Sequence, residues 1–402
     1  MSEESLLLSN IEYEDHRIDN EKYIIEQYGN LSESNIIAQH GQARIYKGEK
    51  KDSGMEVVIK VYSTQEKYEL KKYLREIQIL KLADDPNIID YYDIKFIQQD
   101  ENKAKVFIIM EMMDGDLQKL IQDYKNNKKK IGFKMVMMIF QQLVDGVQFL
   151  HKNKIYHRDL KPQNILFSKV NDENKNLIIK IADFGNVRFA SKEGVSSKTS
   201  EIFISDYYCP PEISNNQFNE LGISHNQIGE QWDLYATGII FLDMLTTNLS
   251  LQGARDIHKI IEEVENDRKT IQEINLINMI KNLTKNISKD NLRPSINIIK
   301  QGLELIEKDN KLDKKKFKEF ISQEELSGQY EVGVREIEER LIEVDPNMIC
   351  TDEEIAELNN MIDQITADVE SGGVAGLEDE SFQEEFQNQL ASIQETLDQL
   401  ID

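Results

Sequence analysis

The pattern of apolar residues changes near Glu111. Before this point, short apolar runs such as 57–59 are typical of half-buried strands, whereas residues 65–82 carry apolar side chains on one face of a helix. Further on, residues 136–151 show amphipathic helical spacing, and helical patterns dominate to about Glu307. The sequence therefore predicts a small strand-rich region followed by a larger helical region.

Two short motifs lie near the middle of the chain. Residues 157–164 are His-Arg-Asp-Leu-Lys-Pro-Gln-Asn, and Asp-Phe-Gly follows at 183–185. Together they resemble the catalytic loop and the metal-binding loop of the protein kinases. The resemblance implies an α+β, bilobal protein kinase fold, with a small β-rich N-lobe and a large helical C-lobe. It also implies transfer of the γ-phosphate of Mg-ATP to a protein hydroxyl.

The resemblance assigns a role to each polar side chain of these motifs. Asp159 would orient the substrate hydroxyl or accept its proton, and Lys161 would neutralise charge on the transferred phosphoryl group. Asn164 and Asp183 would supply oxygen ligands to Mg²⁺. A Lys two positions after the catalytic Asp is typical of the serine/threonine kinases, so we expect Ser or Thr as the acceptor.

Further segments resemble the same family in the expected order. Lys60 ends an apolar run and would lie over the α- and β-phosphates of ATP. Glu76, on the predicted helix, can reach Lys60 and form the ion pair that holds it in place. Residues 111–116 are expected to form the hinge, where Glu111 and Met113 would bind adenine through backbone hydrogen bonds.

The glycine-rich loop departs from the family pattern. The three expected glycines are replaced by Ala38, His40 and Ala43, and only Gly41 remains, one position out of register. Glycine allows the backbone to approach phosphates and to adopt positive φ, so ATP binding should change here. Two interpretations are open: a kinase with a stiffened lid, or a pseudokinase scaffold that binds partners. The intact catalytic side chains favour the kinase.

The activation segment carries a second open question. Arg158 is the residue that, in this family, usually meets a phosphorylated activation loop. Counted back from Glu212, Glu201 falls where related kinases often place the phosphorylated Thr, and its carboxylate would be a partial mimic of phosphate. The alternative is that Thr199 or Ser200 is the phosphorylated residue.

Two structural contacts are also implied by the family. Glu212 belongs to the segment 209–212, which resembles the Ala-Pro-Glu element, and is expected to form a buried ion pair with Arg293. His157 is expected to pack beside Phe184 as a structural residue rather than to transfer a proton.

The length of 402 residues fits one bilobal domain and a smaller module. We predict an N-terminal extension (1–21), a protein kinase domain (22–307) and an acidic helical C-terminal region (308–402). The last region contains three stretches with helical spacing, at 330–344, 355–369 and 382–400. Their apolar stripes would either pack as a small bundle on the large lobe or form a docking or autoinhibitory module.

Charge is distributed unevenly along the chain. The net charge is −25, and residues 306–402 hold 8 Lys and Arg against 27 Asp and Glu. This acidity argues against binding of nucleic acid or an anionic membrane through the tail. It favours a basic protein partner, or intramolecular docking on a basic patch of the kinase itself. The Lys-rich run 125–130 is expected to be a solvated connector between helices.

The remaining signals concern the compartment. Cys209 and Cys350 are the only cysteines, a number that favours a reducing, cytoplasmic environment and excludes a metal-thiolate site. We expect no membrane span, because no apolar stretch has the required length. The first residues also lack the basic and apolar parts of a signal peptide.

Overall fold

The computed structural model describes sixteen stretches of the chain, and all structural statements below concern them. They are residues 18, 20–29, 31–40, 43–64, 76–77, 79–81, 83–98, 104–170, 176–189, 207–214, 225–246, 257–267, 270–287, 291–308, 315–318 and 320–321. The chain divides into two compact units, Met1–Arg188 and Phe189–Asp402.

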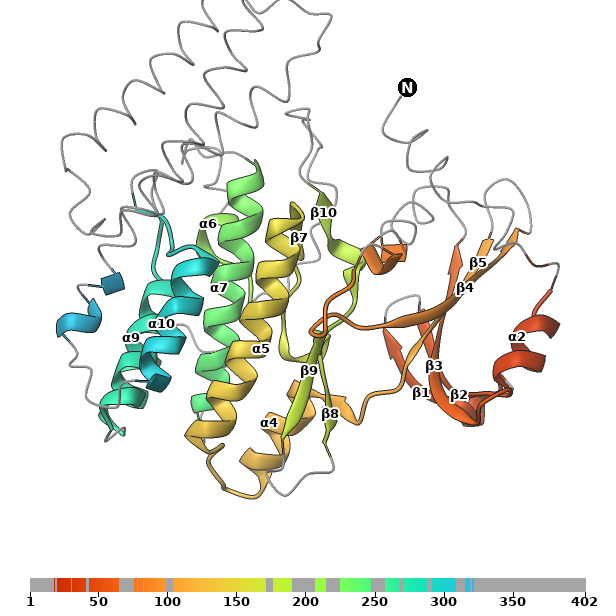
Figure 1. Cartoon of the computed structure of the whole chain (residues 1–402), viewed down its shortest axis with the longest axis horizontal. Helices are drawn as coiled ribbons and strands as arrows, with labels where there is room; N and C mark the ends of the chain where they lie inside the picture. Colours follow the sequence, from red (N-terminus) through yellow and green to blue (C-terminus); the bar gives the residue numbers. More distant parts are fainter. Residues whose placement is uncertain are drawn as a thin grey trace, which may run out of the picture. The chain divides into compact units, whose positions relative to one another are not determined.

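The first unit contains a five-stranded antiparallel sheet in the order β1-β2-β3-β5-β4 (Figure 1). The strands are β1 (Ile36–His40), β2 (Ala43–Lys50), β3 (Met55–Thr64), β4 (Tyr91–Gln98) and β5 (Ala104–Glu111), and η1 (Glu33–Asn35) precedes them. Because side chains alternate along a strand, the central strand β3 has two different faces. Val57, Ile59 and Val61 belong to one core cluster, whereas Lys60 and Tyr62 are on the other face.

The helix α2 (Lys22–Tyr28) packs on the apolar face of this sheet. Ile24 and Tyr28 are buried in the same cluster as Val57 and Ile59. The Tyr28 hydroxyl donates to Asp93 Oδ2 on β4 at 2.9 Å, which fixes the end of the helix to the sheet. A helix at the start of the predicted domain thus closes one face of the sheet and leaves the other for Lys60.

The rest of the first unit combines helices with short strands. Glu76, Ile77 and residues 79–81 are helical, in agreement with the helix predicted over 65–82, whose other positions lie outside the described residues. The further elements are β6 (Gly115–Asp116), α4 (Leu117–Asn126), α5 (Phe133–Lys152), β7 (Ile155–Tyr156), η2 (Pro162–Asn164), β8 (Ile165–Lys169), β9 (Leu177–Ile181), η3 (Phe184–Asn186) and β10 (Arg188–Phe189). Strands β6, β8 and β9 form a three-stranded sheet, and α5 packs against β9.

From Pro211 onward, the described regular elements are helical. They are α6 (Pro211–Ser214), α7 (His225–Leu245), α8 (Ile257–Asn266), α9 (Ile271–Leu283) and α10 (Ile296–Lys308), and residues 315–318 and 320–321 are helical as well. Helix α9 contacts α7, α8 and α10, and a capping box of Thr270 and Glu273 defines its start. The predicted ion pair is present: Arg293 Nη1 and Nη2 lie 2.5 and 3.2 Å from the two carboxylate oxygens of Glu212, and both residues are buried.

The predicted α+β architecture, with a strand-rich region followed by a helical one, is confirmed. One detail was wrong: α4 continues through Asn126, so Lys125 belongs to its last turn and the connector begins at Asn127. A Lys at this position is favourable because helix carboxyl ends carry partial negative charge. The predicted domain limits at 21 and 307 stay predictions, although Phe317 is fully buried beyond the second limit. The three apolar stretches of the tail lie outside the described residues.

Within the described parts of the chain, no helix combines the length and the apolar character that crossing a membrane requires.

The contact between α2 and the sheet can be tested at Gly48. A Cβ at this position would lie 2.6 Å from the backbone oxygen of Tyr28 and 2.8 Å from Cδ1 of Ile59. We expect Gly48→Ala to lower the free energy of unfolding by about 1–3 kcal/mol, because backbone atoms must move. Urea denaturation followed by circular dichroism measures this change.

Gly132→Ser is the matched control for Gly48→Ala. No atom lies within 4 Å of a Cβ at Gly132, and this residue is the N-cap of α5, with φ −65° and ψ 142°. Serine is a favourable N-cap, so stability should stay the same or rise slightly. Equal stability of Gly48→Ala and the wild type would contradict the described packing of α2.

Candidate active site

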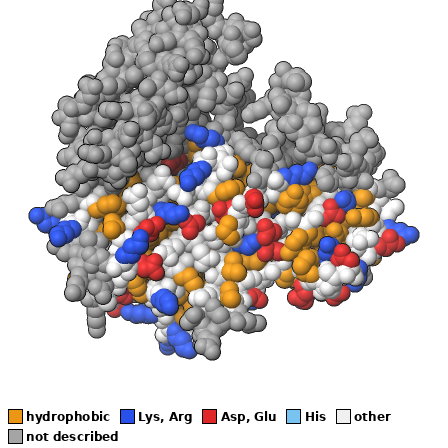
Figure 2. Space-filling view, viewed as in Figure 1, with side chains coloured by type: hydrophobic (Ala, Val, Ile, Leu, Met, Phe, Trp, Pro, Cys, Tyr) orange, Lys and Arg blue, Asp and Glu red, His pale blue; other side chains and the backbone are white. Residues whose placement is uncertain are grey.

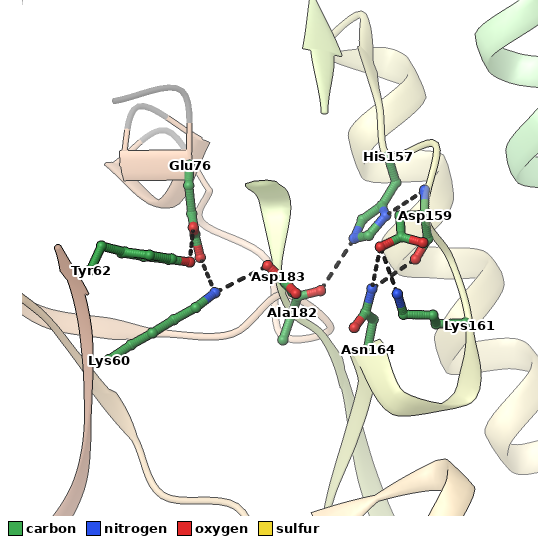
Figure 3. Close-up of polar contacts among 9 residues, drawn as sticks. All are labelled: Lys60, Tyr62, Glu76, His157, Asp159, Lys161, Asn164, Ala182 and Asp183. Carbon is green, nitrogen blue, oxygen red and sulfur yellow. Dashed lines mark hydrogen bonds and ion pairs between the residues drawn. The ribbon is translucent and has the colours of Figure 1, made fainter. Parts of the chain in front are cut away.

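The polar face of β3 carries a buried ion pair. Lys60 Nζ lies 2.8 Å from Glu76 Oε1, and the two residues are 6% and 1% exposed. Figure 3 shows Lys60 extending from its strand toward the helical segment that carries Glu76. The pairing expected from the sequence is therefore formed. A buried charge pair of this kind is stable only while both partners remain, since either charge alone would be left without compensation.

Lys60 also joins the segment that follows β9. Its Nζ donates to Asp183 Oδ1 at 3.1 Å. Burial disfavours the charged forms, but the charges of Asp183 and Glu76 raise the pKa of the Lys60 ammonium above its usual range. Burial likewise opposes ionisation of Asp183, yet the charge of Lys60 and its hydrogen bond bring the pKa of that carboxyl well below its usual range. Both groups are therefore charged at neutral pH.

The second half of the site is the loop before β8. Lys161 Nζ donates to Asp159 Oδ2 at 2.8 Å, and Asn164 Nδ2 donates to the backbone oxygen of Asp159 at 2.7 Å (Figure 3). Asp159 and Asn164 are 9% and 5% exposed. Lys161 thus holds the Asp159 carboxylate, and Asn164 holds the Asp159 backbone. The three residues predicted to be catalytic are thus brought together.

His157 supports this loop from inside the unit. Its Nδ1 accepts from the Asp159 backbone N–H at 3.3 Å, which assigns the proton to Nε2 and lets it donate to the Ala182 oxygen at 3.2 Å. The ring is fully buried, with its centroid 5.3 Å from that of Phe184. This placement agrees with the structural role expected for His157. Its ring connects the segment 157–164 with Ala182, which directly precedes the segment 183–185.

Two residues of these motifs have left-handed backbone conformations. Arg158 has φ 59°, and Asp183 has φ 65°. Neither residue is glycine, so each conformation costs about 1–3 kcal/mol and persists only because the surroundings impose it. Such strained positions concentrate at functional sites. Of the regulatory residues predicted from the sequence, only Arg158 is described; Thr199, Ser200 and Glu201 lie outside the described residues.

The predicted hinge begins where β5 ends. Glu111 Oε1 accepts from Lys180 Nζ at 2.6 Å and from the Asp90 backbone N–H at 2.8 Å. Lys180 Nζ also lies 2.6 Å from Asp90 Oδ2, and these hydrogen bonds help to raise the pKa of Lys180 although burial lowers it. Met113 Sδ accepts from the Ser168 hydroxyl at 3.5 Å. Glu111 and Met113 of the hinge segment are therefore both attached to the β8–β9 sheet.

The glycine-poor lid is described only in part. The pairs Ala38 with Ile45 and His40 with Ala43 show that β1 and β2 form a hairpin, as the family pattern requires. Ala43 is 2% exposed, so its methyl group is accommodated within the sheet. Gly41, the remaining glycine, lies outside the described residues.

Asn164 and Asp183 fit a magnesium ion by their chemistry. The amide nitrogen of Asn164 is used for the Asp159 backbone oxygen, so its carbonyl oxygen is the atom left for a cation. Asp183 is ionised, and its side chain is 39% exposed. Mg²⁺ in phosphate-binding sites typically takes one or two protein oxygen ligands, together with phosphate oxygens and water. This pair supplies such ligands.

Two polar residues of this region were missed by the sequence analysis, Tyr62 and Lys180. The Tyr62 hydroxyl donates to Glu76 Oε2 at 2.6 Å, and Lys180 holds the hinge as described above. A usable signal existed for Tyr62, because a residue two positions after Lys60 on a strand must share its face. No comparable signal marked Lys180, whose partners are distant in sequence.

The comparison with known families agrees with this geometry. The model of the protein kinase domain matches residues 32–326. The match covers well over half of the chain, so the chain belongs to the protein kinase family. Helix α2 precedes the matched residues.

The chain is similar to several plant kinases. The chain is 30% identical over 228 residues to "Cyclin-dependent kinase B2-1" of Arabidopsis thaliana, covering 56% of this chain and 68% of the relative. It is 29% identical, with the same coverage, to "Cell division control protein 2 homolog D" of Antirrhinum majus. It is 28% identical to "CBL-interacting protein kinase 10" of Oryza sativa subsp. japonica, over 58% of this chain and 49% of the relative.

The protein is therefore a protein kinase of the serine/threonine class, an enzyme that uses Mg-ATP and acts on protein substrates. Among the described residues, nothing favours the alternative of a pseudokinase scaffold.

Because Asp183 is assigned to the metal and Asp159 to the acceptor hydroxyl, replacing Asp183 should weaken the binding of Mg-ATP, whereas replacing Asp159 should not. A ligand at 100 times its Kd stabilises the folded state by about 2.7 kcal/mol, which raises the melting temperature. We expect Asp183→Asn to lose most of the rise that Mg-ATP produces in the wild type, because the variant lacks a charged metal ligand. Differential scanning fluorimetry with and without Mg-ATP measures the effect.

Asp159→Asn is the control, because Asp159 is assigned to the acceptor hydroxyl and not to the metal. This variant should keep the rise in melting temperature. An undiminished rise in Asp183→Asn would exclude the assigned metal role.

Proposed function

We propose that Lys60, Glu76 and Asp183 hold Mg-ATP and that Asp159, Lys161 and Asn164 carry out phosphoryl transfer to a Ser or Thr hydroxyl. The observation that carries this proposal is the shared Lys60 ammonium, 2.8 Å from Glu76 and 3.1 Å from Asp183. A kinase needs this cation in place to bind the α- and β-phosphates. Adenine would bind by the backbone at Glu111 and Met113.

Each residue then has a defined part in the transfer. Asp159 accepts the proton of the acceptor hydroxyl. The oxygen of that hydroxyl forms a bond to the γ-phosphorus, and the bond from this phosphorus to the β–γ bridging oxygen breaks. The products are ADP and a phosphorylated Ser or Thr. Lys161, 2.8 Å from Asp159, stabilises negative charge on the transferred group. Asn164 and Asp183 would hold Mg²⁺, which would supply positive charge against the negative charge of the phosphates.

Transfer of labelled γ-phosphate from Mg-ATP to a generic Ser/Thr acceptor tests the proposal. We expect Asp159→Asn to reduce kcat by about 100-fold or more, because general-base positioning contributes about 10²–10⁴-fold. The neutral amide keeps the shape of the side chain, so the melting temperature should change little. Full transfer by Asp159→Asn would overturn the role of Asp159, and no transfer by folded wild type would favour a scaffold.

We further propose that the acidic tail docks on a basic patch of the kinase domain, defined by Lys125, Lys128, Lys129 and Lys130. Lys128–130 are exposed, and the turn that carries them is ordered by the hydrogen bond from the Lys129 N–H to the Tyr124 oxygen at 2.9 Å. Figure 2 shows Lys and Arg side chains gathered at the lower edge of the molecule, where Figure 1 draws the end of α4. No Lys or Arg follows Arg340, so the charges are complementary.

The tail proposal predicts a salt-dependent effect on activity. A chain ending at Leu326 keeps the buried Phe317 and should differ from the full chain in kcat/KM for the acceptor, with higher values if the tail is autoinhibitory. Replacing Lys128, Lys129 and Lys130 by Glu in the full chain should reproduce the effect of truncation. High salt should reduce the difference, since exposed charges are screened. Identical activity of all three proteins at low salt would exclude this docking.

The remaining expectations are proposals of the same kind. We propose the domain limits 1–21, 22–307 and 308–402, and a cytoplasmic location, which the small number of cysteines supports. The tail acidity favours a basic protein surface over nucleic acid or an anionic membrane.

A further inference from the structure

The ion pair at the site has a third buried member, Tyr62. Its side chain lies on the same face of β3 as Lys60, and the residue is 5% exposed. The Tyr62 hydroxyl donates to Glu76 Oε2 at 2.6 Å, whereas Lys60 donates to Oε1 at 2.8 Å (Figure 3). We infer that Tyr62 is a positioning residue, which fixes Glu76 and, through it, the Lys60 ammonium for ATP. The inference rests on the roles proposed above for Lys60 and Glu76.

Two donors hold a carboxylate more firmly than one. The last torsion of a glutamate side chain is broad, so a single hydrogen bond leaves the carboxylate free to rotate. In Glu76, one donor on each oxygen fixes the plane of the group, and both donors come from β3. Glu76 is 1% exposed, so water has little access to replace a donor that is lost. The orientation of Glu76 therefore depends on the Tyr62 hydroxyl.

The Tyr62 ring also restricts Lys60 directly. Lys60 Nζ lies 5.0 Å from the ring centroid, within the range of a cation–π contact. The ammonium is thus surrounded by Glu76, Asp183 and the ring. Because the hydroxyl contacts Glu76 and not a reacting atom, Tyr62 acts through the ion pair.

The lid substitution lies next to Tyr62. Ala43 pairs directly with Tyr62 across β2 and β3, and directly paired residues present their side chains on the same face. Ala43 is 2% exposed and stands where the family pattern expects its third glycine. Ala43, which replaces the expected glycine, and Tyr62 therefore occupy neighbouring positions on the face of the sheet that carries the ion pair.

Tyr62→Phe removes the hydroxyl and keeps the ring, so it tests the hydrogen bond alone. We expect kcat/KM for ATP to fall about tenfold or more, the usual effect of losing a hydrogen bond to a charged group. In a Glu76→Gln background, the same substitution should change kcat/KM little, because its partner charge is already absent. The four proteins are compared by steady-state kinetics, well below the lowest melting temperature.

Tyr28→Phe is the matched control. The Tyr28 hydroxyl also donates to a carboxylate, Asp93 Oδ2, at 2.9 Å, and the residue is also 5% exposed, but it lies on the opposite face of the sheet. This variant should lower the melting temperature and leave kcat/KM for ATP unchanged.

Several outcomes would overturn the inference. A Tyr62→Phe variant with a lower melting temperature and unchanged kcat/KM would make Tyr62 merely structural. Equal losses of kcat/KM in Tyr62→Phe and Tyr28→Phe would also overturn it. So would a double variant of Tyr62→Phe and Glu76→Gln whose loss of kcat/KM is the sum of the two single losses in free energy. Unchanged kinetics in Glu76→Gln would instead overturn the proposed role of Glu76. Failure of the inference about Tyr62 can thus be told apart from failure of the proposed function.

Discussion

The site depends on one buried ammonium, that of Lys60. It connects β3 with the helical segment at Glu76 and with Asp183 after β9. These three segments are separate in the sequence, yet each contributes one charged group. Lys60 and Glu76 are buried, and the Asp183 side chain is 39% exposed. A buried cation requires partners that offset its desolvation, so the geometry of the three segments is coupled. The local fold and the nucleotide binding proposed for Lys60 therefore rest on the same contacts.

One face of β3 belongs to the hydrophobic core, and the other face carries residues of the candidate site. On one face, Val57, Ile59 and Val61 form a core that α2 completes. On the other face, Lys60 and Tyr62 approach Glu76. Since the strand alternates strictly, a shift of one residue in its register would exchange the faces and bury the ammonium in the apolar core. The β2–β3 and β3–β5 pairings therefore position the site as much as they stabilise the sheet.

The departure of the lid from the family pattern is compatible with this site. Ala43 replaces an expected glycine, but its side chain is buried in the sheet beside the position of Tyr62. The polar groups of the catalytic loop and the metal-binding loop are assembled, with Asp159 held by Lys161 and Asn164. The departure from the glycine pattern thus coexists with the contacts expected of Lys60, Lys161 and Asn164.

The sequence by itself determined the family, the catalytic loop and the pairing of Lys60 with Glu76, because short motifs at constrained spacing carry that information. It also determined the order of a strand-rich and a helical region, since apolar periodicity reports local structure. Only the tertiary structure decided that Tyr62 binds the second oxygen of Glu76 and that Lys180 holds Glu111. These contacts join residues that are distant along the chain, and their formation depends on how strands and helices pack, which no local pattern specifies.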